Sequence, residues 1–262
     1  MIFDWFREHH RKALTEQPFP PEWEEILNRN VAQYALLTPD EQQRLRDDLR
    51  VFVDEKTWEG CGGLEITDEM QVTIAAQACL LTLNREHRYF PNVESILVYP
   101  TGYVAQGKAA EPGGIVVEGE SHRLGEAWSN GPVVLSWQDV EIGGMNEKDG
   151  HNVVLHEFAH KLDQNDGAVD GVPLLDSDEQ VEQWAEVMSQ EYEKLVQASE
   201  HGRATLLDHY GATNGGEFFA VATECFFEKS VQMQHQHPEL YELLKDYYKQ
   251  DTAARQTAAS EE

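Results

Sequence analysis

Two histidines stand four residues apart in the stretch VVLHEFAHKLDQNDG, residues 153–167. Residues at positions i and i+4 lie on the same face of a helix, so His156 and His160 can direct ring nitrogens at one ion. The residues around them are mostly apolar, which predicts a buried helix. Burying two imidazoles and a carboxylate without partners would cost several kcal/mol. The pattern therefore favours a metal site over two ordinary core histidines.

Glu157 follows the first of these histidines directly. On a helix its side chain is rotated away from the face that carries the two rings, so it is poorly placed as a ligand. It is well placed beside an open coordination position, where a general base can act on a metal-activated water. The motif H-E-x-x-H therefore indicates hydrolytic chemistry.

A catalytic zinc site needs a third protein ligand, and the residues leave two kinds of candidate. Asp166 stands where metzincins have their third histidine, although Asp163 replaces the glycine of that pattern. The other candidate is a carboxylate on a later helix. In HYGATNGGEFFAVATECFFEKS, residues 209–230, Glu217 and Glu224 lie seven residues apart among apolar side chains. Glu217 is favoured because a carboxylate in the first helical turn is stabilised by the helix dipole.

The charge balance is strongly acidic. Twenty lysines and arginines oppose 48 aspartates and glutamates, for a net charge of −28. This argues against nucleic acid or an anionic membrane as a direct partner, since both need a cationic surface. The three cysteines form no C-x-x-C pair, which predicts a reducing compartment. With no signal sequence and no membrane-spanning segment recognisable, we expect a cytoplasmic protein.

The hydrophobic pattern predicts a single α+β unit. Residues 1–56 read as helices, with a capping box at Thr38 and Glu41, and an apolar helix near Thr67 is expected at the back of the core. Runs rich in β-branched residues after position 95 predict a small sheet. Further helices are expected at 150–164, 177–197, 215–230 and 238–249. We expect residues 1–60 to form an N-terminal helical portion packed on a domain of residues 61–250, and 251–262 to be a disordered tail.

From about residue 60 the chain resembles the Mlc titration factor A family, zinc peptidases of the gluzincin type. The resemblance rests on HEFAHKLDQNDG, GGEFFAVATECFF and GEAWSNGPVVLSW, together with Tyr210. It implies a zincin-like core with a small mixed sheet and an active-site helix. It also implies one Zn²⁺ per chain, held by His156, His160 and Glu217, with Glu157 as the catalytic base. The core of the family is similar to the anthrax lethal factor protease domain, in which a tyrosine precedes the ligand glutamate by seven residues, as here.

The resemblance implies further roles. Tyr210 would donate a hydrogen bond to the oxyanion of the tetrahedral intermediate. Asp163 and Glu224 are candidates to orient a ligand imidazole. His122 would be a possible fourth ligand that makes the enzyme latent, with His151 and His209 as nearby alternatives. Lys161, which stands where zincins usually have an uncharged residue, is expected to point outward.

The resemblance also implies a substrate and a partner. Peptide hydrolysis of the aminopeptidase type is implied, with residues 133–142 as a candidate edge strand that binds peptide, or simply an internal strand. The family is known for binding the glucose repressor Mlc. The alternative to an active enzyme is therefore a regulatory protein that sequesters this repressor and carries a latent or vestigial zinc site.

Overall fold

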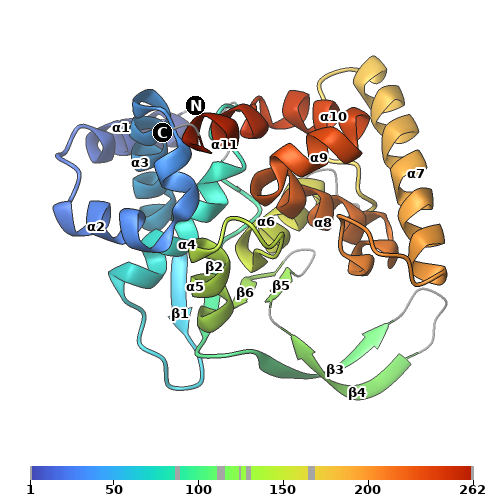
Figure 1. Ribbon diagram of the computed structural model, residues 1–262. Coiled ribbons are helices and arrows are strands. Elements are labelled where there is room, and N and C mark those ends of the chain that lie inside the picture. Colours follow the sequence, from blue (N-terminus) through green and yellow to red (C-terminus); the bar gives the residue numbers. More distant parts are fainter. Residues whose placement is uncertain are drawn as a thin grey trace.

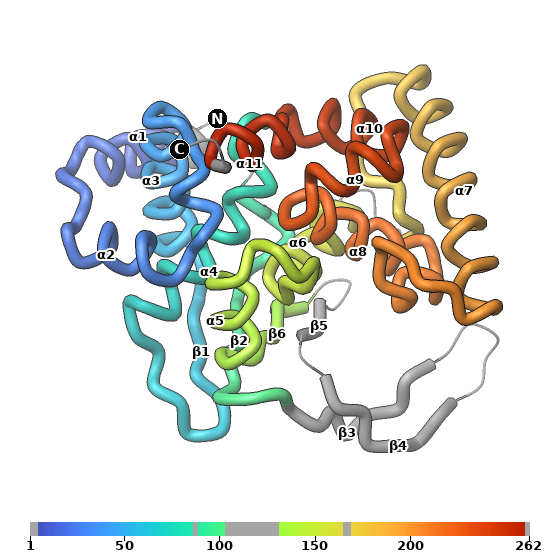
Figure 2. The backbone as a smooth tube through the Cα atoms, viewed as in Figure 1, coloured from blue at the N-terminus to red at the C-terminus, as the bar shows by residue number. Residues whose placement is uncertain are grey.

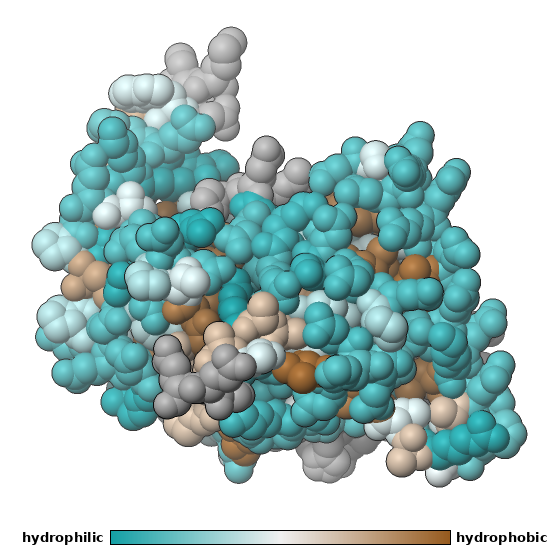
Figure 3. Space-filling view, turned by 45° about the horizontal axis from the view of Figure 1, so that its top comes forward, coloured by the Kyte–Doolittle hydropathy of each residue, from teal (hydrophilic) through white to brown (hydrophobic). Residues whose placement is uncertain are grey.

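The structure is a computed structural model that describes residues 2–85, 89–110, 116–123, 125–127, 131–164 and 169–260. The side chains of residues 2–4, 103–127 and 260 lie outside this description. In the described part of the chain, no helix is long and apolar enough to cross a membrane. The face of the molecule in Figure 3 is largely hydrophilic and carries its hydrophobic residues in small separate patches, as the acidic composition leads us to expect.

The chain begins with helices that pack around a central helix (Figure 1). These elements are α1 (Ile2–Thr15), α2 (Pro21–Asn30), the 3₁₀ helix η1 (Ala32–Leu36), α3 (Pro39–Glu55) and α4 (Asp68–Leu80). The capping box is confirmed: Thr38 accepts a hydrogen bond from the backbone N–H of Glu41, and the Glu41 carboxylate accepts one from the backbone N–H of Thr38. Helix α4 begins after Thr67, is buried along nearly its whole length, and contacts α2, α3, α5 and α6. It is the central core helix that its all-round apolar sequence predicts.

A four-stranded mixed sheet has the strand order β1-β2-β6-β5. Its strands are β1 (Thr57–Gly60), β2 (Ser95–Tyr99), β6 (Val133–Ser136) and β5 (Gly125–Ala127). The pairs β1–β2 and β2–β6 are parallel, whereas β5 is antiparallel to β6. Strands β3 (Tyr103–Ala110) and β4 (Val116–Arg123) pair with each other in a separate antiparallel sheet. The expected α+β class with a small mixed sheet is therefore confirmed.

Residues 133–142 do not form an edge strand; of the two alternatives that the sequence left open, the structure has the internal strand, and it covers residues 133–136 only. Strand β6 ends at Ser136, whose hydroxyl accepts a hydrogen bond from the backbone N–H of Asp139 and so caps helix α5 (Trp137–Met145). In the sheet, β6 lies between β2 and β5 and all four of its residues are buried. The end strand of the sheet that contacts α6 is β5.

The second half of the chain is helical. Its elements are α6 (Val153–Asp163), α7 (Asp178–Glu200), the 3₁₀ helix η3 (His209–Ala212), α8 (Gly215–Glu228), α9 (Ser230–Gln236), α10 (Pro238–Tyr248) and α11 (Thr252–Ser260). The four expected helices are confirmed as α6, α7, α8 and α10, with ends that differ by a few residues.

The expected disordered tail is wrong for residues 252–260, which form α11. The hydroxyl of Thr252 donates to the backbone oxygen of Phe226 at 2.8 Å, and Ala253 is buried. Arg255 forms an ion pair with Glu41 of α3, so the C-terminal helix lies near the N-terminal helices (Figure 2). The polar sequence of α11 gives little hydrophobic signal, and these tertiary contacts hold the helix in place.

Candidate metal centre

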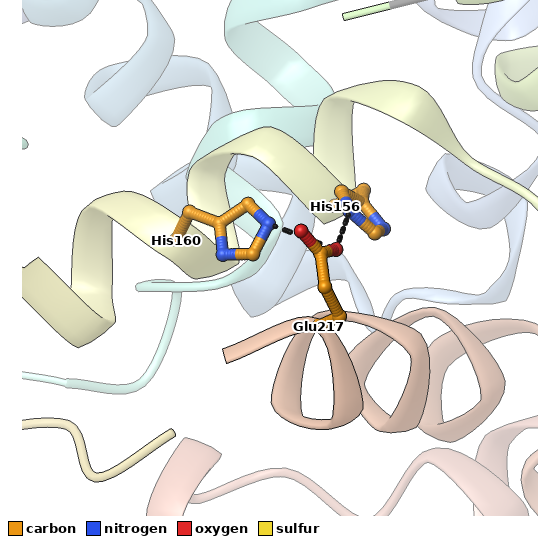
Figure 4. Close-up of side chains that lie close together, drawn as sticks. All are labelled: His156, His160 and Glu217. Atoms are coloured by element: carbon orange, nitrogen blue, oxygen red, sulfur yellow. Dashed lines mark hydrogen bonds and ion pairs between the residues drawn. The ribbon is translucent and has the colours of Figure 1, made fainter. Parts of the chain in front are cut away.

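Helices α6 and α8 pack against each other, and each begins at an asparagine cap. The side-chain oxygen of Asn152 accepts from the backbone N–H of Leu155 at 3.0 Å, and that of Asn214 accepts from Glu217 at 3.0 Å. The caps set where each helix starts and therefore which face its side chains occupy. His156 and His160 of α6 consequently face Glu217 in the first turn of α8 (Figure 4).

The three side chains converge on one point, and we call them the metal centre. One carboxylate oxygen of Glu217, Oε2, lies 3.0 Å from Nε2 of His156 and 3.4 Å from Nε2 of His160. One ligand atom from each residue lies within 4.8 Å of the others. Two ligand atoms around a tetrahedral zinc ion, each about 2.0–2.1 Å from it, lie about 3.3 Å apart. The spacing of this His-His-Glu set therefore fits a metal ion of that size.

The electrostatics of the metal centre favour a charged carboxylate. Burial alone would raise the pKa of Glu217, but hydrogen bonds with His156 and His160 outweigh it and lower this pKa to about 2. Burial would lower the pKa of His156, whereas its hydrogen bonds to Glu217 and Glu224 raise it to about 10. The side chains are 10–18% exposed, so a small molecule can reach them. Strongly shifted pKa values at a partly exposed cluster are typical of functional sites.

Glu224 holds His156 in this orientation. Its Oε1 lies 2.7 Å from Nδ1 of His156, and its Oε2 accepts a hydrogen bond from the backbone N–H of Asn152 at 2.6 Å. A carboxylate that fixes the second nitrogen of a ligand histidine is common around metal ions. Sequence reasoning missed Asn152, which both caps α6 and contacts Glu224. An asparagine directly before an apolar helix is an N-cap signal that could have revealed it.

Glu157 and Lys161 are buried on the same helix. The expectation that Lys161 points outward is wrong, because its side chain is fully buried and Nζ donates to the backbone oxygen of Gly131 at 3.2 Å. Burial lowers the pKa of Lys161 to about 8, partly offset by the charge of Glu157. Lys161 thus ties the helix of the metal centre to the chain that leads into β6.

Tyr210 stands at the rim of the metal centre. Its ring centroid lies 6.0 Å from that of His156, and the residue is 56% exposed. Asp208 caps η3 by accepting a hydrogen bond from the backbone N–H of Tyr210 at 2.7 Å. The structure therefore brings this tyrosine next to the histidine pair, although it is distant in sequence.

His151 and His209 are not part of the metal centre. His209 bonds through Nε2 to the backbone oxygen of Arg203, and His151 lies 3.7 Å from Asp208. His122 is in β4, and its side chain, like the whole of Asp166, lies outside the described residues. Its expected role as a fourth ligand stays a prediction.

Asp163 contacts the chain beyond α6. Both of its carboxylate oxygens accept from the backbone N–H of Gly171, at 3.1 and 2.9 Å. The nitrogen Nδ1 of His160 is buried without a hydrogen-bond partner among the described residues. The hydrogen bonds of Asp163 thus hold a loop, whereas Glu224 contacts a histidine as expected. Gly171 in turn packs against the first turn of α8: a Cβ on it would lie 2.4 Å from the backbone oxygen of Gly215.

The chain matches known proteins over most of its length. The model of a family described as "Glucose-regulated metallo-peptidase M90" matches residues 5–249. An uncharacterized protein of Synechocystis sp. is 39% identical over 246 residues, which cover 94% of this chain and 88% of that protein. Mlc titration factor A of Yersinia pestis is 30% identical over 239 residues, which cover 89% of this chain and 86% of that protein.

Proposed function

Because this chain belongs to the glucose-regulated metallo-peptidase M90 family, we propose that it is a zinc-dependent peptidase of the aminopeptidase type with a zincin-like core. The observation that carries the proposal is the convergence of Nε2 of His156 and Nε2 of His160 on one oxygen of Glu217. In this proposal the three residues hold one Zn²⁺ per chain. The absence of a membrane-spanning helix among the described residues is compatible with the cytoplasmic location that we propose.

The zinc ion and the polar residues around the metal centre have separate roles in this proposal. Zinc, when bound, would polarise the scissile carbonyl and acidify a water molecule. Glu157 would accept the proton of the attacking water and pass it to the leaving amine. Tyr210, at the exposed rim, would donate its hydroxyl hydrogen to the oxyanion. Glu224 would keep Nδ1 of His156 protonated, so that Nε2 of the neutral ring presents its lone pair.

We also propose that peptide substrates bind along β5. This strand ends the sheet and contacts α6, the helix that carries both histidines. A peptide in extended conformation can add to such an edge through backbone hydrogen bonds. Strand β6, the earlier candidate, has neighbours on both sides and offers no such edge.

Substitution of Glu157 tests the enzymatic proposal. Purified protein should contain zinc and cleave chromogenic amino-acid or peptide substrates, and a chelator should abolish the activity until zinc is added back. Glu157→Gln should keep its zinc but lose about 10²–10⁴-fold in kcat. Glu193→Gln, an exposed change on α7, is the control and should be as active as the wild type. Zinc-loaded protein that cleaves no peptide, or an unimpaired Glu157→Gln variant, would refute the proposal.

A second function is supported by the relative named Mlc titration factor A. We propose that this chain also binds an Mlc-type repressor, and its net charge of −28 favours a basic patch on such a partner. Calorimetric titration of purified repressor into wild-type protein and into Glu157→Gln would separate the two functions. Binding to both proteins means that repressor capture does not need catalysis. If neither binds, the regulatory proposal fails while the enzymatic one stands.

A further inference from the structure

A cavity opens between α7, α10 and the loop before α7, and no residue of the metal centre lines it. Part of its lining is apolar. The buried ring of Trp184 packs edge to face on Tyr247, with ring centroids 5.2 Å apart. Leu174, Leu175 and Leu243 also line the cavity. A concave apolar surface of this kind holds the hydrocarbon part of a small ligand.

Five charged side chains line the same cavity, and three of them are already paired. Asp246 lies 3.0 Å from Lys249, and Glu242 lies 3.6 Å from Lys245, which is closer, at 2.8 Å, to Asp251. Lys249 thus offsets the charge of Asp246, whereas Glu242 shares its lysine with Asp251 and is offset only in part. The other two charged residues that line the cavity are one cation, Arg85, and one anion, Asp176.

Arg85 and Asp176 have no charged partner among the described residues. The guanidinium of Arg85 lies 4.0 Å above the centroid of the Tyr247 ring and donates through Nη1 to the backbone oxygen of Tyr247. Its other N–H groups are available for a carboxylate, which an arginine fork binds well. The backbone N–H of Asp176 donates to Gln180 at 2.9 Å, and its carboxylate is available for a cation.

We infer that this cavity is a second small-molecule site, which binds a free apolar amino acid of about the size of leucine. The α-carboxylate would pair with Arg85, the α-ammonium with Asp176, and the side chain would rest on Trp184 and Leu243. A ligand with only a carboxylate would leave Asp176 unpaired and face the acidic residues of α10. A ligand with only an ammonium would leave Arg85 unpaired. A zwitterion with an apolar side chain pairs with both charges at once.

Isothermal titration calorimetry tests the inference on full-length protein kept in chelator, so that a metal-bound amino acid does not contribute. The probes are L-leucine, L-leucinamide, which lacks the carboxylate, and 4-methylpentanoate, which lacks the ammonium. Leucine should bind at millimolar concentration or below. Both analogues should bind about tenfold more weakly, because each loses one charge-assisted contact.

Two variants and a control locate the site. Arg85→Gln should weaken leucine binding about tenfold. Asp176→Asn, in an exposed loop, should weaken leucine binding but leave 4-methylpentanoate unaffected. Arg44→Gln, an exposed arginine on α3, should bind leucine as the wild type does. Thermal melts of each variant show whether it is folded.

Three results would overturn the inference. The first is a wild-type protein that does not bind leucine at millimolar concentration. The second is that folded Arg85→Gln and folded Asp176→Asn both bind leucine as tightly as the wild type does, which would place the ligand elsewhere. The third is equal affinity for leucine and either analogue, which would exclude a zwitterion.

Discussion

Glu224 contacts His156 on the side of the ring opposite to Glu217. The distance from Glu224 Oε1 to Nδ1 of His156 is 2.7 Å, and Nε2 of the same ring lies 3.0 Å from Oε2 of Glu217. A carboxylate only accepts hydrogen bonds, so Nδ1 carries a proton toward Glu224. Nε2 likewise carries a proton toward Glu217, in keeping with the raised pKa of His156. A metal ion would take the place of the Nε2 proton, while Nδ1 stays protonated toward Glu224. Helix α8 thus supplies Glu217, the carboxylate of the metal centre, and Glu224, the carboxylate that orients His156.

Replacing Glu224 with glutamine should weaken zinc binding without unfolding the protein. The neutral amide accepts a weaker hydrogen bond from Nδ1 and no longer favours one ring tautomer as strongly. We expect the zinc affinity to fall about 10–100-fold. Competition with a chromophoric chelator measures this affinity, with Glu193→Gln as the control. An unchanged affinity would contradict the role given to Glu224.

Replacing Glu217 with alanine should cause nearly all of the zinc to be lost on dialysis. The change leaves His156 and His160 as the remaining ligands of the proposed set. Two protein ligands bind zinc too weakly to retain it during dialysis. Metal analysis by mass spectrometry should find about one zinc per wild-type chain and only a small fraction in the variant. Full zinc occupancy in Glu217→Ala would show that the third ligand is another residue.

Replacing Gly171 with alanine should destabilise the contact between the loop and α8. Gly171 has φ +85°, and a Cβ there would lie 2.4 Å from the backbone oxygen of Gly215. Gly63 also has φ +85°, but a Cβ there would have no neighbour within 4 Å, which makes Gly63→Ala a matched control. We expect Gly63→Ala to cost about 1 kcal/mol of unfolding free energy and Gly171→Ala about 2–4 kcal/mol. Urea denaturation measures both, and equal losses would mean that the loop moves away at little cost.

Replacing Glu228 with glutamine should change how stability depends on pH. Burial, reinforced by the charges of Glu224 and Asp149, raises the pKa of Glu228 from 4.5 to about 9. The folded state therefore keeps a proton that the unfolded state loses. The stability that Glu228 contributes is fully present below pH 4.5 and is lost as the pH rises through about 9.

The glutamine variant cannot ionise and can still accept the hydrogen bond that the backbone N–H of Gly150 donates to Glu228. It should become more stable than the wild type as the pH rises from about 5 to 9, by roughly 1–3 kcal/mol. Denaturant midpoints at several pH values measure this difference. Parallel profiles for the two proteins would show that the carboxyl of Glu228 titrates normally.

Local patterns in the sequence predicted much of the site. The spacing of His156 and His160 places both rings on one face of α6, and the apolar surroundings of Glu217 indicate a buried carboxylate. The capping box at Thr38 and the helices α6, α7, α8 and α10 follow from turn residues and periodicity in the same way. The contact of Glu217 with the histidines rests on more than local pattern, because it depends on the packing of α8 against α6. The other candidate for the third ligand, Asp166, lies outside the described residues.

Other features had no local signal. Lys161 looks like a surface lysine in a helix, yet it is buried against Gly131. Residues 133–142 are rich in strand-forming side chains, yet the Ser136 cap starts a helix in their middle. Helix α11 is polar, yet Thr252 and Arg255 hold it on the core. In each case a contact with a residue distant in the chain, or a competing cap, outweighed the propensity of the segment.

The sequence alone determined which residues share a helix face, because the helical period and the caps depend on neighbours within a few positions. It therefore placed His156 and His160 on one face of α6, and Glu217 and Glu224 on one face of α8, independently of any tertiary contact. Only the tertiary structure decided that Glu217, 61 residues away, contacts both rings, and that Glu224 and Asn152 orient one of them. That arrangement depends on how two apolar helices pack and on the backbone contact between Gly171 and Gly215, which no local pattern encodes.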